Sequence, residues 1–165
     1  MFALVLIILA VGIIVPFSIG YILAVSNNAP RVNTDFTMTA TGTAYDDRNQ
    51  ENVNVSISIT GTAEGKLETT VSINARGGDV NVENYGTFSV SSGSGTIDQS
   101  GDTSLELDLA EQYGGKQTTW MLSCKVNSVE EKTFSVTLSS ASVSLPLDDY
   151  PSLTNLSLNG TVIFQ

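Results

Sequence analysis

The chain has 165 residues and a formal net charge of −10, from 7 basic and 17 acidic side chains, with no histidine and one cysteine. This acidic balance argues against nucleic acid as a partner, because affinity for nucleic acid comes mainly from Lys and Arg side chains that neutralise phosphates. The missing histidine excludes a Ser-His-Asp triad, a Cys-His pair and any histidine metal site. A single cysteine excludes an internal disulfide, so the fold depends on its hydrophobic core.

An uncharged segment opens the chain. Residues 2–25 read FALVLIILAVGIIVPFSIGYILAV, and the first charged side chain is Arg31. A membrane core about 30 Å thick is crossed by about 20 helical residues. The segment therefore predicts one transmembrane anchor helix over residues 1–26, with membrane lipid as its surroundings.

Small and helix-bending residues recur along this predicted helix. They are the residues that let a neighbouring helix approach closely in lipid: Gly12, Pro16 and Gly20. A cleaved secretory signal is the alternative, with a weak cleavage site near Ala24 and Ser26. The apolar stretch is longer than the roughly 7–15 residues of a typical signal peptide, which favours the anchor.

Residues 27–35 are predicted to be a linker, and residues 36–165 an extracytoplasmic β domain. Alternation begins at FTMTATGTAY, residues 36–45, where apolar side chains occupy one face of a strand and threonines the other. The same pattern recurs over residues 53–60 and around Val71 and Ile73.

Glycine-containing segments predict the turns of the first half. We expect a turn over residues 62–65 and a hairpin at Gly77-Gly78. The Ser-Gly-Ser-Gly segment, residues 92–95, is expected to form a loop between two short strands.

The second half continues the alternation with longer strands. Gly114 and Gly115 follow Tyr113 and predict a turn into a strand whose inward side chains are Trp120, Leu122, Cys124 and Val126. The inward positions then change from even to odd numbers, which predicts a β-bulge near Ser139 and Ser140. Eight to ten strands joined by short turns predict an all-β antiparallel meander, either a β-sandwich or a small barrel.

Oxygen-bearing side chains are concentrated in one predicted turn. Asp46, Asp47, Asn49 and Glu51 lie within six residues, and Ca²⁺ takes six to eight oxygen ligands. Their spacing does not match the EF-hand loop. A Ca²⁺ site here competes with the simpler interpretation of a solvated turn, and no other cofactor is expected.

Three N-glycosylation acceptors occur, Asn54-Val-Ser, Asn155-Leu-Ser and Asn159-Gly-Thr. Each is expected on the polar face of its strand, where a glycan would project into solvent. These acceptors favour an extracytoplasmic location at the cell surface, whereas Arg31 beside the apolar run weakly favours the opposite orientation.

Paired carboxylates are the remaining candidates for catalysis. Asp46-Asp47, Glu130-Glu131 and Asp148-Asp149 could in principle perform acid/base chemistry on an envelope polysaccharide. Adjacent carboxylates in turns are usually solvated loop residues, and Cys124 follows the inward alternation of a buried thiol. We therefore expect the chain not to be an enzyme.

An apolar N-terminal helix followed by a Thr/Ser-rich β domain with glycosylation acceptors resembles, in layout, archaeal type IV pilins and other N-terminally anchored surface proteins. The resemblance covers the arrangement of the chain and implies a helix packed in a filament core, with the β domain outside. The leading hypothesis is an anchored β domain with a structural or partner-binding role, including that of an accessory subunit of a membrane complex. Other membrane or surface protein subunits are its expected partners, and a pilin-like filament subunit is the alternative.

Overall fold

The computed structural model describes residues 31–66, 70–128 and 132–165. The predicted anchor helix, with its Gly12, Pro16 and Gly20, lies outside these residues. Within the described ranges, no helix has the length and apolar character needed to cross a membrane.

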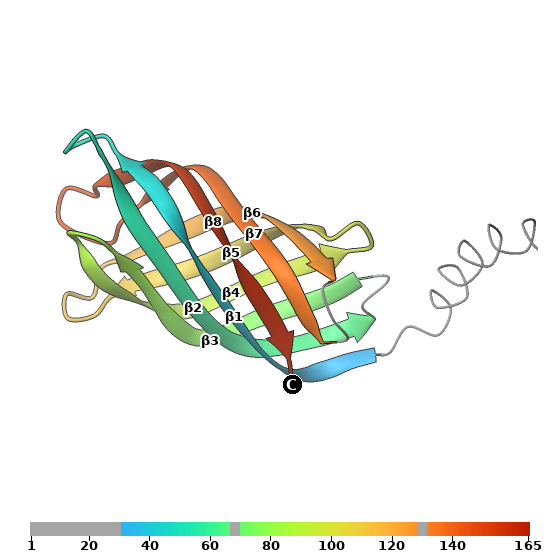
Figure 1. Cartoon of the computed structure of the whole chain (residues 1–165). Helices are drawn as coiled ribbons and strands as arrows, with labels where there is room; N and C mark the ends of the chain where they lie inside the picture. The colour runs from blue at the N-terminus through green and yellow to red at the C-terminus, as the bar shows by residue number, and fades with distance from the viewer. Residues whose placement is uncertain (1–30, 67–69, 129–131) are drawn as a thin grey trace, which may run out of the picture. The chain divides into compact units, whose positions relative to one another are not determined.

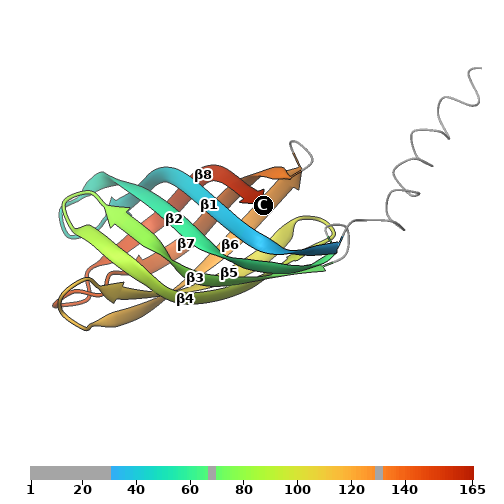
Figure 2. The same cartoon turned by 90° about the horizontal axis from the view of Figure 1, so that it is seen from below.

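Eight antiparallel strands form a closed barrel in which each strand pairs with the next and β8 pairs with β1 (Figures 1 and 2). The all-β antiparallel prediction is confirmed, and the barrel is the correct one of its two proposed architectures. The strands are β1 (Arg31–Asp46), β2 (Glu51–Lys66), β3 (Thr70–Val82), β4 (Gly86–Asp98), β5 (Asp102–Glu111), β6 (Gln117–Ser128), β7 (Thr133–Ser144) and β8 (Ser152–Phe164).

The up-and-down order gives the barrel two distinct ends. One end, here called distal, carries the turns β1–β2, β3–β4, β5–β6 and β7–β8, which lie together on one side of Figure 1. The other end, here called proximal, carries the start of β1 at Arg31, the β4–β5 turn and the end of β8. Residues 31–35, predicted as linker, are part of β1 and pair with β2.

Period-two alternation fills the barrel interior with apolar side chains. The largest buried side chains include Trp120, Phe36, Phe88 and Met38. Glycine and alanine occupy other inward positions, and this mixture of large and small side chains is how a small barrel is filled. The inward placement predicted for Trp120, Leu122, Cys124 and Val126 is confirmed.

The turns predicted at residues 62–65 and at Gly77-Gly78 are wrong, because both segments lie inside long strands. The register between β2 and β3 shifts between Thr60 and Gly61, which marks a β-bulge beside Gly77 and Gly78. Gly78 has φ of 137°, and a Cβ there would lie 2.8 Å from the Cα of Ile59. Gly78 therefore permits a close approach of two strands within the sheet.

The loop predicted at residues 92–95 is also wrong, since β4 runs unbroken through it. A Cβ on Gly93 would meet the side chain of Leu107 at 2.7 Å, and one on Gly95 would meet that of Leu105 at 3.2 Å. The missing side chains therefore make room for large residues of β5, and this segment is not a break in the strand.

In β7 the inward-facing positions change from even to odd numbers, as predicted. The predicted cause, a β-bulge near Ser139 and Ser140, is wrong. Leu138 and Val143 both face the interior, yet the pairing of β7 with β8 keeps one register throughout. The neighbouring β8 changes its inward positions as well, at Asn155, which has φ of 53°. Both strands therefore change face together and stay in register with each other, whereas the β1–β8 register shifts between Thr43 and Tyr45.

The single thiol provides a test of the core. Cys124 is 5% exposed, and burial raises the pKa of its thiol to about 12. Because the thiolate is the reactive form, we expect the native protein to react with a disulfide reagent at pH 8 far more slowly than the urea-unfolded chain. Equal rates of thiol release, followed by absorbance, would contradict a buried Cys124.

Candidate functional site

The distal turns form one connected surface, here called the distal turn cluster: residues 47–50, 83–85, 112–116 and 145–151. Polar side-chain contacts join these turns, although they are far apart in the sequence. Asn84 Nδ2 donates to Glu51 Oε1 at 3.0 Å, which links the second turn to the first. Arg48 lies 3.6 Å from Asp149, and Lys116 pairs with Asp148. The four turns are therefore held as a unit, although exposed ion pairs each contribute little stability.

Asp46, at the end of β1, is fully buried at the base of this cluster. Its Oδ1 accepts hydrogen bonds from the backbone N–H groups of Arg48 and Asn49, at 2.9 and 3.3 Å. Its Oδ2 accepts from Asn49 Nδ2 at 2.8 Å and from the Tyr85 hydroxyl at 2.6 Å. The carboxylate thereby connects the β1–β2 turn to the β3–β4 turn.

The surroundings shift the pKa values of both the buried Asp46 and the half-buried Tyr85. Burial alone raises the pKa of Asp46, but hydrogen bonds from Tyr85, Asn49 and Arg48 together outweigh it and lower that pKa below its ordinary value. Burial and the neighbouring Asp46 carboxylate raise the pKa of Tyr85. Asp46 therefore stays charged and Tyr85 stays a hydrogen-bond donor at neutral pH.

Large aromatic side chains project from the same cluster. Tyr113 is 93% exposed and Tyr150 is 56% exposed, both in distal turns. Exposed carboxylates in or beside these turns include those of Asp47, Asp148 and Asp149. Tyrosine is enriched at protein interfaces because its ring gives apolar contact area and its hydroxyl a hydrogen bond. The cluster therefore exposes aromatic rings beside carboxylates.

The four residues of the predicted Ca²⁺ site do not direct their oxygens to one point. Both oxygens of Asp46 are occupied by donors, and Glu51 accepts from Asn84. Asp47 Oδ1 accepts instead from Thr154 on β8, at 3.4 Å. In the described part of the chain, no group of three or more Asp, Glu, His or Cys side chains is placed to hold a metal ion. A cation here would have to displace several of these hydrogen bonds.

The glycosylation acceptors all lie on the outer wall. Asn54 Nδ2 donates to Glu83 Oε2 at 2.7 Å, whereas Asn159 uses its Oδ1 to accept from Thr137 at 2.9 Å. Asn155 is exposed at the kink of β8. The attachment of glycans to these residues stays a prediction.

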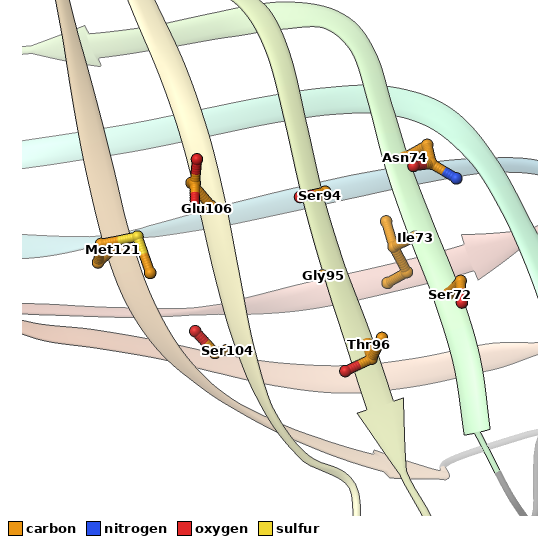
Figure 3. A pocket seen from close by; sticks show the side chains of 9 residues that line it. All are labelled: Ser72, Ile73, Asn74, Ser94, Gly95, Thr96, Ser104, Glu106 and Met121. Atoms are coloured by element: carbon orange, nitrogen blue, oxygen red, sulfur yellow. The ribbon is translucent and has the colours of Figure 1, made fainter.

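A shallow trough crosses the outer wall from β3 to β6 (Figure 3). Small residues such as Ser72, Ser94 and Ser104 line it together with larger side chains. One cross-strand row of the trough runs Asn74, Ser94, Glu106 and Met121. The side chains that line it include one carboxylate, that of Glu106, and no aromatic ring. The trough therefore offers neither the paired carboxylates nor the stacking surface expected of a glycosidase.

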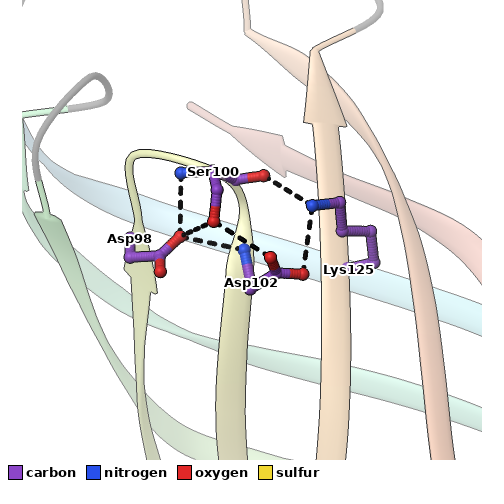
Figure 4. A network of polar contacts seen from close by, with 4 residues as sticks. All are labelled: Asp98, Ser100, Asp102 and Lys125. Carbon is purple, nitrogen blue, oxygen red and sulfur yellow. Dashed lines mark hydrogen bonds and ion pairs between the residues drawn. The ribbon is translucent and has the colours of Figure 1, made fainter.

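The β4–β5 turn at the proximal end contains a second polar network (Figure 4). Asp98 Oδ1 accepts from the backbone N–H and hydroxyl of Ser100, and Lys125 Nζ lies 3.0 Å from Asp102 Oδ1. The Ser100 hydroxyl lowers the pKa of Asp98, and Lys125 lowers that of Asp102. Asp98 Oδ1 also accepts from the backbone N–H of Asp102 at 3.0 Å, so the network fixes the turn.

The paired carboxylates have separate partners. Asp148 pairs with Lys116 and Asp149 with Arg48, while Glu130 and Glu131 lie outside the described residues.

Comparisons of the chain with protein families, with curated proteins and with solved structures find no match. The candidate site therefore has to be judged on its own geometry.

Sequence reasoning identified the β1–β2 turn but missed the tyrosines. Tyr85, Tyr113 and Tyr150 each lie in a different distal turn. An alternating meander places every second turn at the same end, so Tyr85 joins the other two only once Gly77-Gly78 and residues 92–95 are placed inside strands.

Proposed function

We propose that the chain is a non-enzymatic, single-span membrane protein whose extracytoplasmic β barrel binds a partner protein through the distal turn cluster. The observation that carries this proposal is the exposure of Tyr113 and Tyr150 among acidic side chains, on turns that are joined to one another. A preorganised surface binds with a smaller loss of conformational entropy than mobile loops do.

The direction of the chain is compatible with this role. β1 begins at Arg31 at the proximal end, a full strand length from the distal tyrosines. The uncharged run of residues 2–25 supports an anchor upstream of Arg31. The net charge of −10 favours a partner with a basic surface and repels anionic surfaces.

The experiment expresses the full chain in its native host and follows it through soluble, membrane and sheared-surface fractions. We expect the full chain in the membrane fraction, and a variant that lacks residues 2–25 as a folded soluble barrel. A full chain that stays soluble contradicts the anchor. Recovery in sheared fibres would instead support the pilin-like alternative.

Cross-linking in the same membranes tests the distal surface. A neighbouring protein that is captured by the full chain should be lost in the Tyr113→Ala/Tyr150→Ala variant. Ile163→Ala is the matched control, because Ile163 is 43% exposed and lies near the proximal end. Equal loss of capture in both variants, or in neither, would contradict binding through the tyrosines.

A further inference from the structure

The backbone pairing between β6 and β7 covers only part of these two strands. These strands pair only from Ser123 opposite Ser139 to Ser128 opposite Phe134. β6 begins six residues earlier, at Gln117, and β7 continues to Ser144. We call residues 117–122 of β6 and residues 140–144 of β7 the open seam.

Each strand of the open seam is paired with another strand on its opposite side. On its other side, β6 pairs with β5 from Gln117 to Lys125. β7 likewise pairs with β8 as far as Ser144 opposite Ser152. In the ranges that the structure describes, no strand pairs with the facing edges of residues 117–122 and 140–144. Each edge therefore presents main-chain N–H and C=O groups without a ladder partner, although the C=O of Ser142 accepts from the Ser140 hydroxyl at 3.0 Å.

One contact across the seam shows that the two strands have separated. The indole Nε1–H of Trp120 donates to the backbone C=O of Ser144 at 2.9 Å. In a paired ladder, a backbone N–H of β6 would donate to this C=O, and the two strands would lie about 4.8 Å apart. Here a long side chain extends to the carbonyl instead. Trp120 is fully buried, so its ring belongs to the floor of the seam.

The side chains beside the seam differ between its inner and outer faces. Trp120, Leu122 and Val143 face inward and are buried. On the outer face, Met121 is 54% exposed and lies opposite Glu106 of β5, while Thr119 lies opposite Asp108. The inner face is therefore apolar, and the outer rim on β5 is anionic.

We propose that the open seam binds an extended segment of a partner protein by strand addition. The segment is about six residues long, matching residues 117–122. Its inward side chains are small and apolar, because Trp120, Leu122 and Val143 already fill the interior. Its outward side chains are polar or basic and reach across β6 toward Glu106, whereas both oxygens of Asp108 already accept from Ser92 and Thr119. Main-chain hydrogen bonds to the two edges provide the affinity, and the alternating side chains provide selectivity. This inference rests on the proposed function and names the form in which the partner binds.

The position of the seam agrees with that function. β6 begins and β7 ends at the distal end, so the seam opens toward the distal turn cluster. Lys116 and Asp148 pair beside this opening, across the β5–β6 and β7–β8 turns. A partner held by Tyr113 and Tyr150 would therefore have the seam within its reach.

The test uses the full chain in detergent and a synthetic acetylated, amidated peptide, Lys-Val-Thr-Val-Lys-Val-Thr. Hydrogen exchange measured on fragments of the chain should slow at least about tenfold over residues 117–122 and 140–144, with residues 123–128 unchanged. A peptide N-methylated at alternate residues keeps its side chains but loses hydrogen-bond donors, and it should give no protection.

Charge variants supply the second measurement. Glu106→Gln should weaken binding of the lysine peptide about threefold, the size of one exposed ion pair. Glu64→Gln, an exposed carboxylate on β2, is the matched control and should leave binding unchanged.

Three outcomes would overturn the inference: no protection at saturating peptide, equal protection of residues 123–128, or equal binding of the N-methylated peptide. Protection that rises with protein concentration and needs no peptide would assign the seam to a second copy of the chain, and overturns it too. If capture still depends on Tyr113 and Tyr150 in any of these cases, the seam inference fails and the proposed function stands.

Discussion

Replacing Gly160 by alanine is expected to lower the free energy of unfolding by about 3 kcal/mol or more, because the new methyl group meets backbone that has no room to retreat. A Cβ at Gly160 would overlap the carbonyl oxygen of Thr39, and would lie 2.5 Å from the Cα of Ala40. Gly160 is paired with Ala40 where β8 meets β1. The substitution therefore acts on the pairing of β1 with β8, which closes the barrel.

Gly77→Ala is the matched control for this experiment. Nothing lies within 4 Å of a Cβ built on Gly77. Its unfolding free energy should change by no more than about 0.5 kcal/mol. Urea unfolding followed by the fluorescence of the single tryptophan, Trp120, measures both variants. Equal stability of the two variants would contradict the close β1–β8 approach.

The second large effect concerns the buried carboxylate. Asp46→Asn should destabilise the barrel by about 2 kcal/mol at neutral pH, since hydrogen bonds to a charged acceptor contribute about 1.5–3 kcal/mol. Asparagine keeps one acceptor oxygen, but its amide would face the donors of Asn49 and Tyr85. Asp47→Asn is the control, because the Asp47 side chain is exposed.

The pH dependence of this difference follows from the lowered pKa. The folded-state pKa of Asp46 lies below its ordinary value of 3.8, so the charged form is the one that folding favours. Its stabilisation is complete above the unfolded pKa and is lost as the pH falls through the folded pKa. The stability gap between the wild type and Asp46→Asn should therefore be constant near neutral pH and shrink below about pH 4. A gap that widens in acid would contradict this assignment.

The alternation of the strands could be read from the sequence because a period of two is a local property. Side chains such as Phe36, Leu107 and Trp120 needed only their neighbours in the chain to be placed inward. The choice between sandwich and barrel needed the pairing of Phe36 with Phe164, which no local pattern contains.

Glycines and turns were harder to interpret for the same reason. Gly78 and Gly93 are explained by the strand that lies opposite, so a glycine inside a long strand resembled a turn in the sequence. Asp46 was predicted as a Ca²⁺ ligand. Its hydrogen bond from Tyr85 could not be read locally, because Tyr85 lies in a turn 39 residues away. The open seam left no sequence signal, since Gln117–Leu122 alternates like any paired strand.

Closure of the barrel by its first and last described strands has a consequence for biosynthesis. β1 emerges from the ribosome early but receives its second neighbour only when β8 has been made. Until then, the growing chain exposes an incomplete sheet with two unpaired edges and an uncovered apolar face. Sequence-distant contacts of this kind also form slowly. A chain with this topology depends on protection from aggregation throughout its synthesis. The barrel closes in one late step, when β8 pairs with β1.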